Sequence, residues 1–595
     1  MHPLLSIKNL SVDFASGRDL TNALSNISFS INRNEVLALV GESGSGKSVT
    51  ALSILQLLAS PPAKYSSGEI LFSADGNSEI DLLQTDQKSL QDIRGNKIAM
   101  IFQEPMTSLN PVLTCGSQVM EAIRSHKKIT ATEAKTQTIE WFSKVKLPDP
   151  DTVFNRYPHQ LSGGQKQRVM IAMAMCCHPS LLICDEPTTA LDVTVQKNIL
   201  QLIKELQQQE NMGVIFITHD FGVVAEIADR AIVMYKGEIA EQNTVQQIFT
   251  DPQHPYTKAL LACRPVNHKR GERLPVVSDF LEPRSEVRNE KSENKLQTPT
   301  DNYQAGNKNS ETKIKTTDPT SVPIAIIPQT SILLHAEHLS VWFPAKKTLF
   351  GKPLKFIKAV DDVSFDVYKG ETLGLVGESG CGKTTLGRTL LRLIDPNEGK
   401  IIYNGIDLTK KKRDELRILR KDIQIIFQDP YSSLNPRLTI GSAIAEPMKV
   451  HGLAATGKQQ KNKVTELLEK VNLGAEYYNR YPHEISGGQR QRIVIARALA
   501  LDPSFIVCDE SVSALDVSVQ AQVLNLLNDL KKEFGFTIIF ISHDLSVVRY
   551  ISNRIMVMNK GKIVETGEAD AIYFDPQTDY SKKLIASIPK GFTNL

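Results

Sequence analysis

The sequence predicts an α/β protein made of two copies of one domain, each built on a parallel sheet and joined to the other by a flexible linker. The chain has 595 residues, which is too long for one ordinary domain. Five motifs occur twice in the same order, from Gly41 and Gly377 to His219 and His543. Short apolar runs without alternation precede these motifs, which is typical of strands buried on both faces of a sheet. These observations together predict a domain duplication.

The composition excludes several classes of protein. Hydrophobic residues make up 41% and charged residues 23%, which is ordinary for a globular protein and excludes general disorder. A net charge of +3 is too small to indicate nucleic-acid or anionic-lipid binding by itself. No run approaches the roughly 18 apolar residues of a membrane-spanning helix, and the N-terminus lacks the pattern of a signal peptide. The seven scattered cysteines form no Cys-x-x-Cys pair, so we expect a reducing compartment.

The two copies are nearly equal in spacing. The first copy has about eleven extra residues, which we expect in a polar loop near Ser73–Asp86. Between the copies, residues 281–320 contain only four large aliphatic residues and balanced charges, so this segment is predicted to be a flexible linker.

Three apolar runs of the first copy are predicted to be parallel strands, namely Val36–Val40, Leu181–Cys184 and Val214–Ile217. A helix is expected over Gln165–Cys177. Functional side chains follow each of the three runs, and ligands bind at the carboxyl ends of strands in such sheets.

A glycine-rich loop of the form Gly-x4-Gly-Lys-Ser/Thr follows the first predicted strand of each copy. Glycines let backbone N–H groups surround phosphates, the lysine reaches the β- and γ-phosphates, and the hydroxyl that follows can ligate Mg²⁺. The candidate phosphate-binding residues are Gly41, Ser43, Gly44, Gly46, Lys47 and Ser48, and in the second copy Gly377, Ser379, Gly380, Gly382, Lys383 and Thr384.

An Asp-Glu pair ends another strand of each copy, as Asp185-Glu186 and Asp509-Glu510. The aspartate can hold Mg²⁺ and the glutamate can polarise an attacking water. The alternative is an ordinary helix N-cap with an acidic first turn. A histidine 33 residues after each glutamate, His219 or His543, favours the catalytic interpretation, although a single histidine is more often a core residue.

Two Ser-Gly-Gly-Gln motifs each begin a predicted helix. They consist of Ser162, Gly163, Gly164 and Gln165, and of Ser486, Gly487, Gly488 and Gln489. A helix N-terminus with a serine hydroxyl binds anions, although ordinary capping explains the motif equally well when it is taken alone. Because each copy already has a phosphate loop, the second anion site suggests contact with the nucleotide of the other copy. Gln103 and Gln428 follow Ile-Phe and are uninformative by themselves.

The ordered set resembles the ATP-binding cassette (ABC) nucleotide-binding domain. The resemblance covers almost the whole chain except the linker, and it implies a RecA-like sheet core, an antiparallel β-subdomain and a helical subdomain. It identifies Walker A, Q-loop, signature, Walker B and switch-histidine motifs, and the D-loops 189–192 and 513–516. It implies a head-to-tail pair of domains that enclose two ATP molecules, each bound by one domain's Walker motifs and the other domain's signature.

The family also implies individual roles. The catalytic residues would be Glu186, His219 and Gln103, and Glu510, His543 and Gln428. Mg²⁺ would be held by Ser48, Gln103 and Asp185, and by Thr384, Gln428 and Asp509. Phe14 and Phe343 match the aromatic residue that stacks on adenine, with an ordinary core aromatic as the alternative. Ser511 stands after Glu510 where the family has proline, and Ile485 replaces the signature leucine.

Further motifs resemble ATPases of the dipeptide, oligopeptide and nickel importers, including Phe102–Pro105, Ser108–Pro111 and His254–Thr257. The chain looks like two such ATPases fused, as in glutathione- and microcin C-type importers. The resemblance implies two integral-membrane permease subunits as partners, a solute-binding protein that acts indirectly, and a peripheral place on the cytoplasmic face of the inner membrane. No iron–sulfur cluster is expected, because only Cys263 lies in the region where some relatives ligate one. No nucleic-acid partner is expected either, because the net charge is small.

The predicted boundaries are 1–250 and 329–570 for the two cassette domains, 251–280 for an extension of the peptide-importer type, 281–328 for the linker, and 571–595 for a C-terminal tail. The competing hypothesis is a soluble tandem ABC ATPase that acts on ribosomes or nucleic acid without transport. Such proteins typically have a basic helical arm between the domains, which the charge-balanced linker does not resemble.

Overall fold

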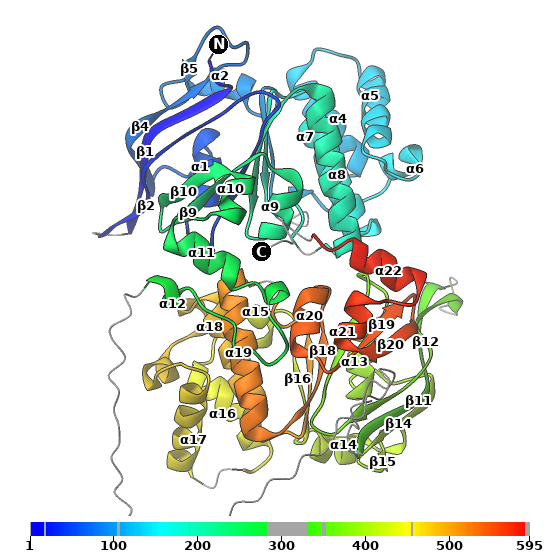
Figure 1. Ribbon diagram of the computed structural model, residues 1–595. Coiled ribbons are helices and arrows are strands. Elements are labelled where there is room, and N and C mark those ends of the chain that lie inside the picture. Colours follow the sequence, from blue (N-terminus) through cyan, green and yellow to red (C-terminus); the bar gives the residue numbers. More distant parts are fainter. Residues whose placement is uncertain are drawn as a thin grey trace, which may run out of the picture.

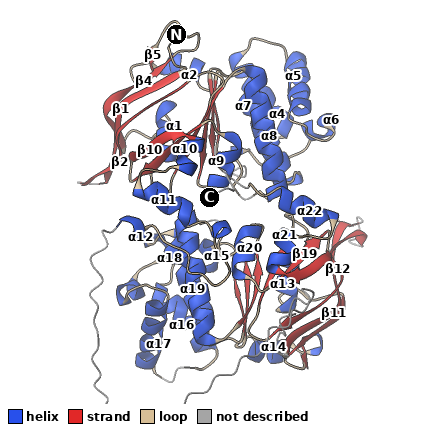
Figure 2. Cartoon of the chain, viewed as in Figure 1, coloured by secondary structure: helices blue, strands red, loops and turns tan. Residues whose placement is uncertain are grey.

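Two α/β domains lie one above the other in the computed structural model (Figure 1). The structure describes residues 2–16, 19–103, 108–189, 191–281, 331–347, 353–453, 456–513 and 515–589, so nearly all of the predicted linker lies outside the described residues. Each domain contains a six-stranded, mostly parallel sheet, a four-stranded antiparallel sheet and a group of helices (Figure 2). This arrangement confirms the predicted fold class.

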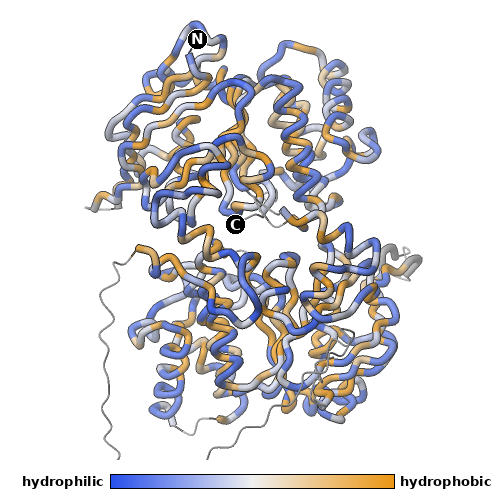
Figure 3. The backbone as a smooth tube through the Cα atoms, in the orientation of Figure 1, coloured by the Kyte–Doolittle hydropathy of each residue, from blue (hydrophilic) through white to orange (hydrophobic). Residues whose placement is uncertain are grey.

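The parallel sheet of the first domain has the strand order β10-β9-β3-β8-β7-β6. Its strands are β3 (Val36–Val40), β6 (Ile98–Ile101), β7 (Leu181–Asp185), β8 (Gly213–Thr218), β9 (Arg230–Tyr235) and β10 (Glu238–Thr244). β3, β7 and β8 are the three strands predicted from the sequence, and every residue in them is buried. Helices cover both faces of this sheet, so its strands need apolar side chains on both sides. Figure 3 shows the result as apolar segments in the interior of each domain.

The antiparallel sheet has the order β2-β1-β4-β5, with β1 (Leu5–Ser16), β2 (Asp19–Ile31), β4 (Ala63–Phe72) and β5 (Ile80–Asp81). The predicted position of the extra residues is only half right. The loop 73–79 between β4 and β5 has five more residues than its counterpart 404–405, and most of the remainder lie in β4 itself, which has ten residues against six in its counterpart Glu398–Tyr403. The polar composition of 73–86 gave no sign of this division.

The helices of the first domain form two groups. The helical subdomain contains α4 (Cys115–His126), α5 (Ala131–Lys144), α6 (Pro150–Phe154) and α7 (Gly163–Met175), with α7 in the place of the helix predicted over Gln165–Cys177. The sheet is accompanied by α1 (Lys47–Ile54), α2 (Gln87–Ile93), α8 (Val193–Glu210), α9 (Phe221–Ile227) and α10 (Val245–Thr250). The short 3₁₀ helix η1 (Pro158–Gln160) leads into α7.

The second domain repeats this plan. Its parallel sheet has the order β16-β17-β18-β13-β19-β20 and its antiparallel sheet the order β12-β11-β14-β15. The strands are β11 (Ile332–Lys347), β12 (Pro353–Tyr368), β13 (Thr372–Val376), β14 (Glu398–Tyr403), β15 (Ile406–Asp407), β16 (Ile423–Ile426), β17 (Phe505–Asp509), β18 (Thr537–Ile541), β19 (Arg554–Asn559) and β20 (Lys562–Glu568). The helices are α13 (Lys383–Leu390), η3 (Leu408–Lys410), α14 (Arg413–Leu419), α15 (Pro430–Ser433), α16 (Ile440–Val450), α17 (Gly457–Lys470), η4 (Ala475–Asn479), η5 (Pro482–Glu484), α18 (Gly487–Leu499), α19 (Val517–Phe534) and α20 (Leu545–Ile551).

Each domain continues into a C-terminal helical segment. The first has α11 (Pro255–Ala262), η2 (Pro265–Asn267) and α12 (Ser278–Leu281), and the second has α21 (Ala569–Phe574) and α22 (Asp579–Ala586). Figure 1 shows the first segment between the two domains. Its Cys263 and Leu274 are buried in a hydrophobic cluster formed mainly by the second domain. Among the described helices, none is both long and apolar enough to cross a bilayer.

Candidate nucleotide sites

The phosphate loop of the first domain lies between β3 and α1. Gly44 and Gly46 have φ values of 80° and 104°, which side-chain-bearing residues rarely adopt, and a Cβ on Gly46 would collide with Leu24. The Lys47 ammonium is buried and donates to the carbonyl oxygens of Gly41 and Glu42, both at 2.8 Å. Burial lowers the pKa of Lys47, and nearby carboxylates oppose this shift, first of all that of Asp516 in the second domain. The loop thus surrounds a lysine whose charge interacts with a carboxylate of the other domain.

The second phosphate loop, between β13 and α13, repeats this geometry. Lys383 Nζ donates to the carbonyl oxygens of Gly377 and Glu378 at 2.8 and 3.0 Å. Gly380 and Gly382 have φ values of 79° and 113°. Both loops therefore offer a backbone cradle closed by a lysine, which is the arrangement expected for a polyphosphate.

A hydroxyl and an aspartate meet beside each loop. Ser48 Oγ donates to Asp185 Oδ1 at 3.2 Å, and Thr384 Oγ1 donates to Asp509 Oδ1 at 2.9 Å. Burial raises the pKa of both carboxyls above the ordinary value. Asp509 Oδ2 is buried without a hydrogen-bond partner among the described residues, and Arg388 Nη2 is 3.9 Å from it. Such paired oxygens fit a hard divalent cation like Mg²⁺.

Glu186 lies at the centre of three polar contacts. Gln103 Nε2 and Thr189 Oγ1 donate to its Oε2 at 3.0 and 2.9 Å, and His219 Nδ1 lies 3.3 Å from its Oε1. Burial opposes ionisation of Glu186, but the hydrogen bond and charge of His219 outweigh it and lower the pKa to about 2. Burial likewise disfavours the charged form of His219, and Glu186 raises the pKa of His219 above its usual value. The sequence predicted the glutamate, histidine and glutamine, and the structure brings all three together.

Glu510 has the corresponding neighbours with one difference. Gln428 Nε2 donates to Glu510 Oε2 at 2.7 Å, and His543 Nδ1 lies 3.6 Å from the same oxygen. Burial opposes ionisation here too, while the nearby His543 lowers the pKa of Glu510. Ser513, however, donates to the backbone carbonyl oxygen of Glu510 at 2.9 Å, whereas its counterpart Thr189 donates to the carboxylate of Glu186. The two glutamates are therefore held differently.

The Ser-Gly-Gly-Gln motifs both form capping boxes. Ser162 is the N-cap of α7 and Ser486 the N-cap of α18, and each serine exchanges hydrogen bonds with the glutamine three residues later. A Cβ on Gly164 or Gly488 would collide with Val195 or Val519 of the next long helix. Capping thus explains the local shape of both motifs, and the helix N-terminus remains available to a ligand.

A pocket between the domains joins the first phosphate loop to the second signature. Glu42 and Ser43 line it from one side, and Ser486, Gly487 and Gly488 line it from the other. Ser43 Oγ donates to Asp516 Oδ1 at 3.2 Å, and Ser518 Oγ donates to the Glu42 carboxylate. A second pocket contains Ser379, Gln428 and Glu510 together with Thr189, Leu191 and Asp192 of the first domain. Each site therefore receives residues from both domains.

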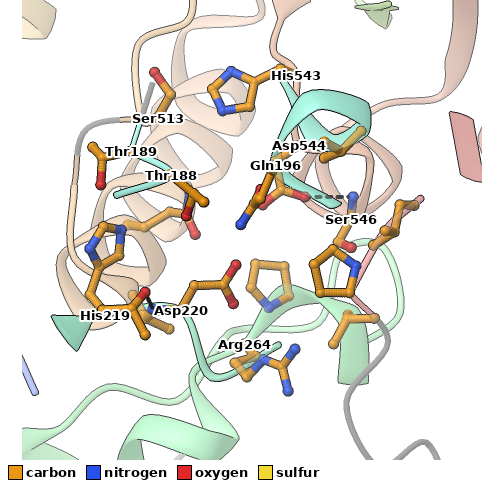
Figure 4. Close-up of a pocket in the computed structure, with 18 of the residues that line it drawn as sticks. Thr188, Thr189, Gln196, His219, Asp220, Arg264, Ser513, His543, Asp544 and Ser546 are labelled. Atoms are coloured by element: carbon orange, nitrogen blue, oxygen red, sulfur yellow. Dashed lines mark hydrogen bonds between the residues drawn. The ribbon is translucent and has the colours of Figure 1, made fainter. Parts of the chain in front are cut away.

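A central cavity lies between these two sites (Figure 4). His219 and Asp220 enter it from the first domain, and His543 and Asp544 enter it from the second. Thr188, Thr189 and Ser513 lie along the same cavity, and Arg264 reaches it from the C-terminal segment of the first domain. The two switch histidines therefore border one shared space.

The two candidate adenine-stacking residues are placed differently. Phe14 lies on β1 and packs partly against the core of its domain, as the alternative interpretation expected. Phe343 lies on β11 with 42% of its surface exposed. A stacking role is thus more accessible at Phe343 than at Phe14.

Sequence reasoning missed several residues of the sites. Thr189 and Asp516 belong to the D-loops but received no individual role, and Glu42 and Ser518 received none at all. Asp516, Glu42 and Ser518 make contacts that cross between the domains, so no local spacing could show them. Thr189 contacts Glu186 only three residues away, and its hydroxyl was not given a role. Tyr256 was noted only as part of the importer motif His254–Thr257, and Tyr580 was missed, although each contacts a phosphate loop. The internal repeat was the available signal, because Tyr580 stands 324 residues after Tyr256.

Known proteins and two family models are similar to this chain. The family model described as "ABC transporter" matches residues 24–189 and 360–513, and the model "Oligopeptide/dipeptide transporter, C-terminal region" matches residues 240–286. The Glutathione import ATP-binding protein GsiA of Escherichia coli (strain K12) is 48% identical over 98% of this chain and 89% of its own length. The protein of the same name from Shigella sonnei (strain Ss046) is equally similar. A solved dimeric structure of the ATP-binding cassette MJ0796 bound to ADP and Pi is 28% identical, with 40% of this chain and 98% of that chain covered and a TM-score of 0.36.

Proposed function

Because the chain belongs to the ABC transporter family of ATP-binding subunits and hydrolyses ATP, we propose that it drives the import of glutathione or a similar short peptide across a membrane. The observation that carries this proposal is the likeness to glutathione import ATP-binding proteins over 98% of the chain. The match of residues 240–286 to the C-terminal region of oligopeptide and dipeptide transporters supports the same class of solute. The relatives named above do not support the alternative of a tandem ATPase that acts on ribosomes or nucleic acid.

Each site has the groups that hydrolysis requires. Lys47 and the N–H groups of its loop would bind the β- and γ-phosphates, and Ser48, Asp185 and Gln103 would hold Mg²⁺. When bound, Mg²⁺ neutralises charge on the phosphate oxygens. Glu186 would orient the attacking water as its general base, since its lowered pKa keeps it ionised. His219 holds this carboxylate in place. Lys383, Thr384, Asp509, Gln428, Glu510 and His543 would act in the same way at the second site.

Both sites are composite in this proposal. The pocket that contains Ser43 and Ser486 supports contact of the second signature with nucleotide on the first loop. By the internal repeat, Ser162 would contact nucleotide on the loop of Lys383. Phe14 and Phe343 would stack on the adenines. Closure of the two domains on ATP, followed by hydrolysis and opening, would supply the mechanical step of transport.

The membrane part of the importer must come from other chains. We infer two integral-membrane permease subunits that contact the surface around Gln103 and Gln428, and a solute-binding protein that delivers the solute. The chain would thus be a peripheral protein on the cytoplasmic face of the membrane.

The test is reconstitution of the chain with its permeases and solute-binding protein in vesicles. Glutathione or a short peptide on the delivery side should stimulate ATP hydrolysis and accumulate on the other side. The matched control is the Glu186→Gln/Glu510→Gln chain, which should assemble but neither hydrolyse nor transport. If no solute of this class changes the ATPase rate of the complete complex, the import proposal is wrong.

A further inference from the structure

A tyrosine from each C-terminal segment contacts the phosphate loop of its own domain. Tyr256, on α11, accepts a hydrogen bond on its hydroxyl oxygen from the backbone N–H of Glu42 at 3.1 Å. Tyr580, on α22, accepts one from the backbone N–H of Glu378 at 3.2 Å. Glu42 and Glu378 are the second residues of the two loops. Tyr256 is among the largest side chains that are fully buried, so its hydroxyl is fixed in position.

The two tyrosines are held by the same construction in both domains. Glu241, on β10, accepts hydrogen bonds from the N–H groups of Gln253 and His254 at 2.8 and 3.0 Å, just before α11. Glu565, on β20, accepts them from Gln577 and Thr578 at 2.7 and 3.1 Å, just before α22.

The sequences at these helix starts differ. The first domain has His254-Pro255 and caps its helix with the imidazole of His254, whereas the second has Thr578-Asp579 and caps its helix with the hydroxyl of Thr578. The contact of the tyrosine with the loop is the same in both. The internal repeat therefore supplies two independent instances of one geometry.

Each hydroxyl is suited to hold a backbone N–H. Burial raises the pKa of Tyr256, with a further rise from the charge of Glu42, and burial raises the pKa of Tyr580 to about 12. Both side chains therefore stay protonated and neutral near pH 7. A neutral hydroxyl accepts the amide hydrogen without placing a negative charge next to the phosphates.

The backbone of the phosphate loops is of a kind that such a contact would help to order. Three glycines in each loop have positive φ values, from 80° to 151° in the first loop and from 79° to 152° in the second. A glycine-rich segment loses much conformational freedom when it closes around a ligand. A contact that orders the loop before the ligand arrives lowers that cost and strengthens binding.

The far end of the first segment is fastened to the other domain. Asn525, on α19, bonds both backbone groups of Leu274, at 2.9 and 2.8 Å. Tyr550, on α20, donates to the carbonyl oxygen of Glu272 at 2.6 Å. Reciprocally, Lys197 on α8 donates to the carbonyl oxygen of Ala586 at 2.9 Å. Each tyrosine thus lies on a segment anchored at both ends, which makes it a firm support for the loop.

We propose that Tyr256 and Tyr580 are positioning residues that hold the phosphate loops of their own domains in the shape that binds nucleotide. Neither residue touches the reacting atoms, so each acts through the backbone of the loop. The proposal rests on nucleotide binding by the two loops and not on the solute or the permeases of the proposed function.

The test measures nucleotide affinity at one site at a time in the full chain. Tyr256→Phe is made together with Lys383→Ala, so that the first site is read, and Tyr580→Phe is made together with Lys47→Ala. Phenylalanine keeps the ring and removes only the hydroxyl. We expect the Kd for a fluorescent ATP analogue to rise about three- to tenfold, which is what one hydrogen bond is worth. In the otherwise native chain, KM for ATP should rise in the same proportion while kcat changes less than twofold.

The control is Tyr573→Phe, because Tyr573 lies on α21 and its ring packs against Phe574 and Arg549. It should leave Kd unchanged. An unchanged Kd in both Tyr256→Phe and Tyr580→Phe overturns the proposal, and so does a fall in kcat without a rise in KM. If Tyr256→Phe weakens the site of Lys383 as much as that of Lys47, its effect is general and the positioning role is wrong. None of these readouts needs permeases or solute, so they remain valid if the import proposal fails.

Discussion

At the scale of single residues, the two sites depend on a glutamate held between a histidine and a glutamine. Glu186 and Glu510 each have a positive φ, 46° and 48°, and each donates its N–H to a carbonyl of the neighbouring strand. This backbone turn directs the carboxylates toward the interface between domains instead of into the sheet. The strain of such a conformation is tolerated where function requires a particular direction.

Replacement of these glutamates tests their role directly. Glu186→Gln with Glu510→Gln should slow hydrolysis at least 100-fold, because general-base assistance is worth about 10²- to 10⁴-fold. Nucleotide binding should persist, since glutamine has nearly the same shape. Phosphate release and nucleotide binding are measured on the same preparation, with the exposed Glu238→Gln as control. Near-native phosphate release in the double variant would exclude both residues as bases.

The ion pair of Glu186 and His219 predicts a pH dependence of stability. The pKa of His219 is raised, so its stabilising contribution is complete below about pH 6.5 and is lost as the pH rises through the folded-state value. The pKa of Glu186 is lowered to about 2, so its contribution is complete above about pH 4.5 and is lost as the pH falls toward 2.

Thermal unfolding of the nucleotide-free chain checks this prediction. The Tm difference between the native chain and His219→Gln should be larger at pH 6 than at pH 9. His451→Gln, outside the sites, should show no such trend. A difference that is equal at both pH values would mean that the pair contributes no charge interaction.

At the scale of elements, α19 connects three features. It begins next to the D-loop residue Asp516, which contacts Ser43, and its Ser518 contacts Glu42. Further along, Asn525 holds the C-terminal segment of the first domain. One helix of the second domain therefore contacts both the phosphate loop and the extension of the first.

Removal of the Asn525 side chain should loosen that segment. Asn525→Ala would leave the buried N–H and carbonyl of Leu274 without partners, at a cost of about 1–3 kcal/mol each. We expect a lower Tm and faster tryptic cleavage at Lys269, Arg270 and Arg273. Asn479→Ala, at an exposed position, is the control. Unaltered cleavage would show that the segment is held by its other contacts alone.

The elements also show what a sequence can predict. The strands before each motif were predictable because buried parallel strands need continuous apolar residues. The second tyrosine segment was not recognised, because Thr578-Asp579 replaces His254-Pro255, although Tyr580 and Lys582 repeat Tyr256 and Lys258. Contacts such as Asn525 with Leu274 join residues about 250 positions apart, and no local pattern records them. The division of the extra residues between β4 and the loop after it was missed for a related reason, since loop composition does not fix where a strand begins.

At the scale of the whole molecule, the two domains should close on ATP around composite sites. A disulfide between Ser43→Cys and Ser486→Cys should form faster with ATP in the Glu186→Gln/Glu510→Gln background than without nucleotide. The seven native cysteines are buried and should not interfere. The control pair is Ser43→Cys with Ser162→Cys, which joins the loop to the signature of its own domain. Efficient cross-linking of the control pair, or indifference of the first pair to ATP, would contradict the composite arrangement.

The two glutamates are supported differently, because the hydroxyl of Thr189 donates to the carboxylate of Glu186, whereas that of Ser513 donates to the backbone carbonyl of Glu510. This difference has a consequence for how such a protein can evolve. In an ATPase made of two identical chains, every substitution alters both sites at once, so a change harmful to either is eliminated. Here one gene encodes both copies, and every molecule contains one of each in fixed proportion. A mutation at Ser513 or Thr189 is therefore exposed to selection at a single site. The two halves are therefore free to diverge until hydrolysis at one site determines the rate of the cycle and the other site serves only to bind ATP.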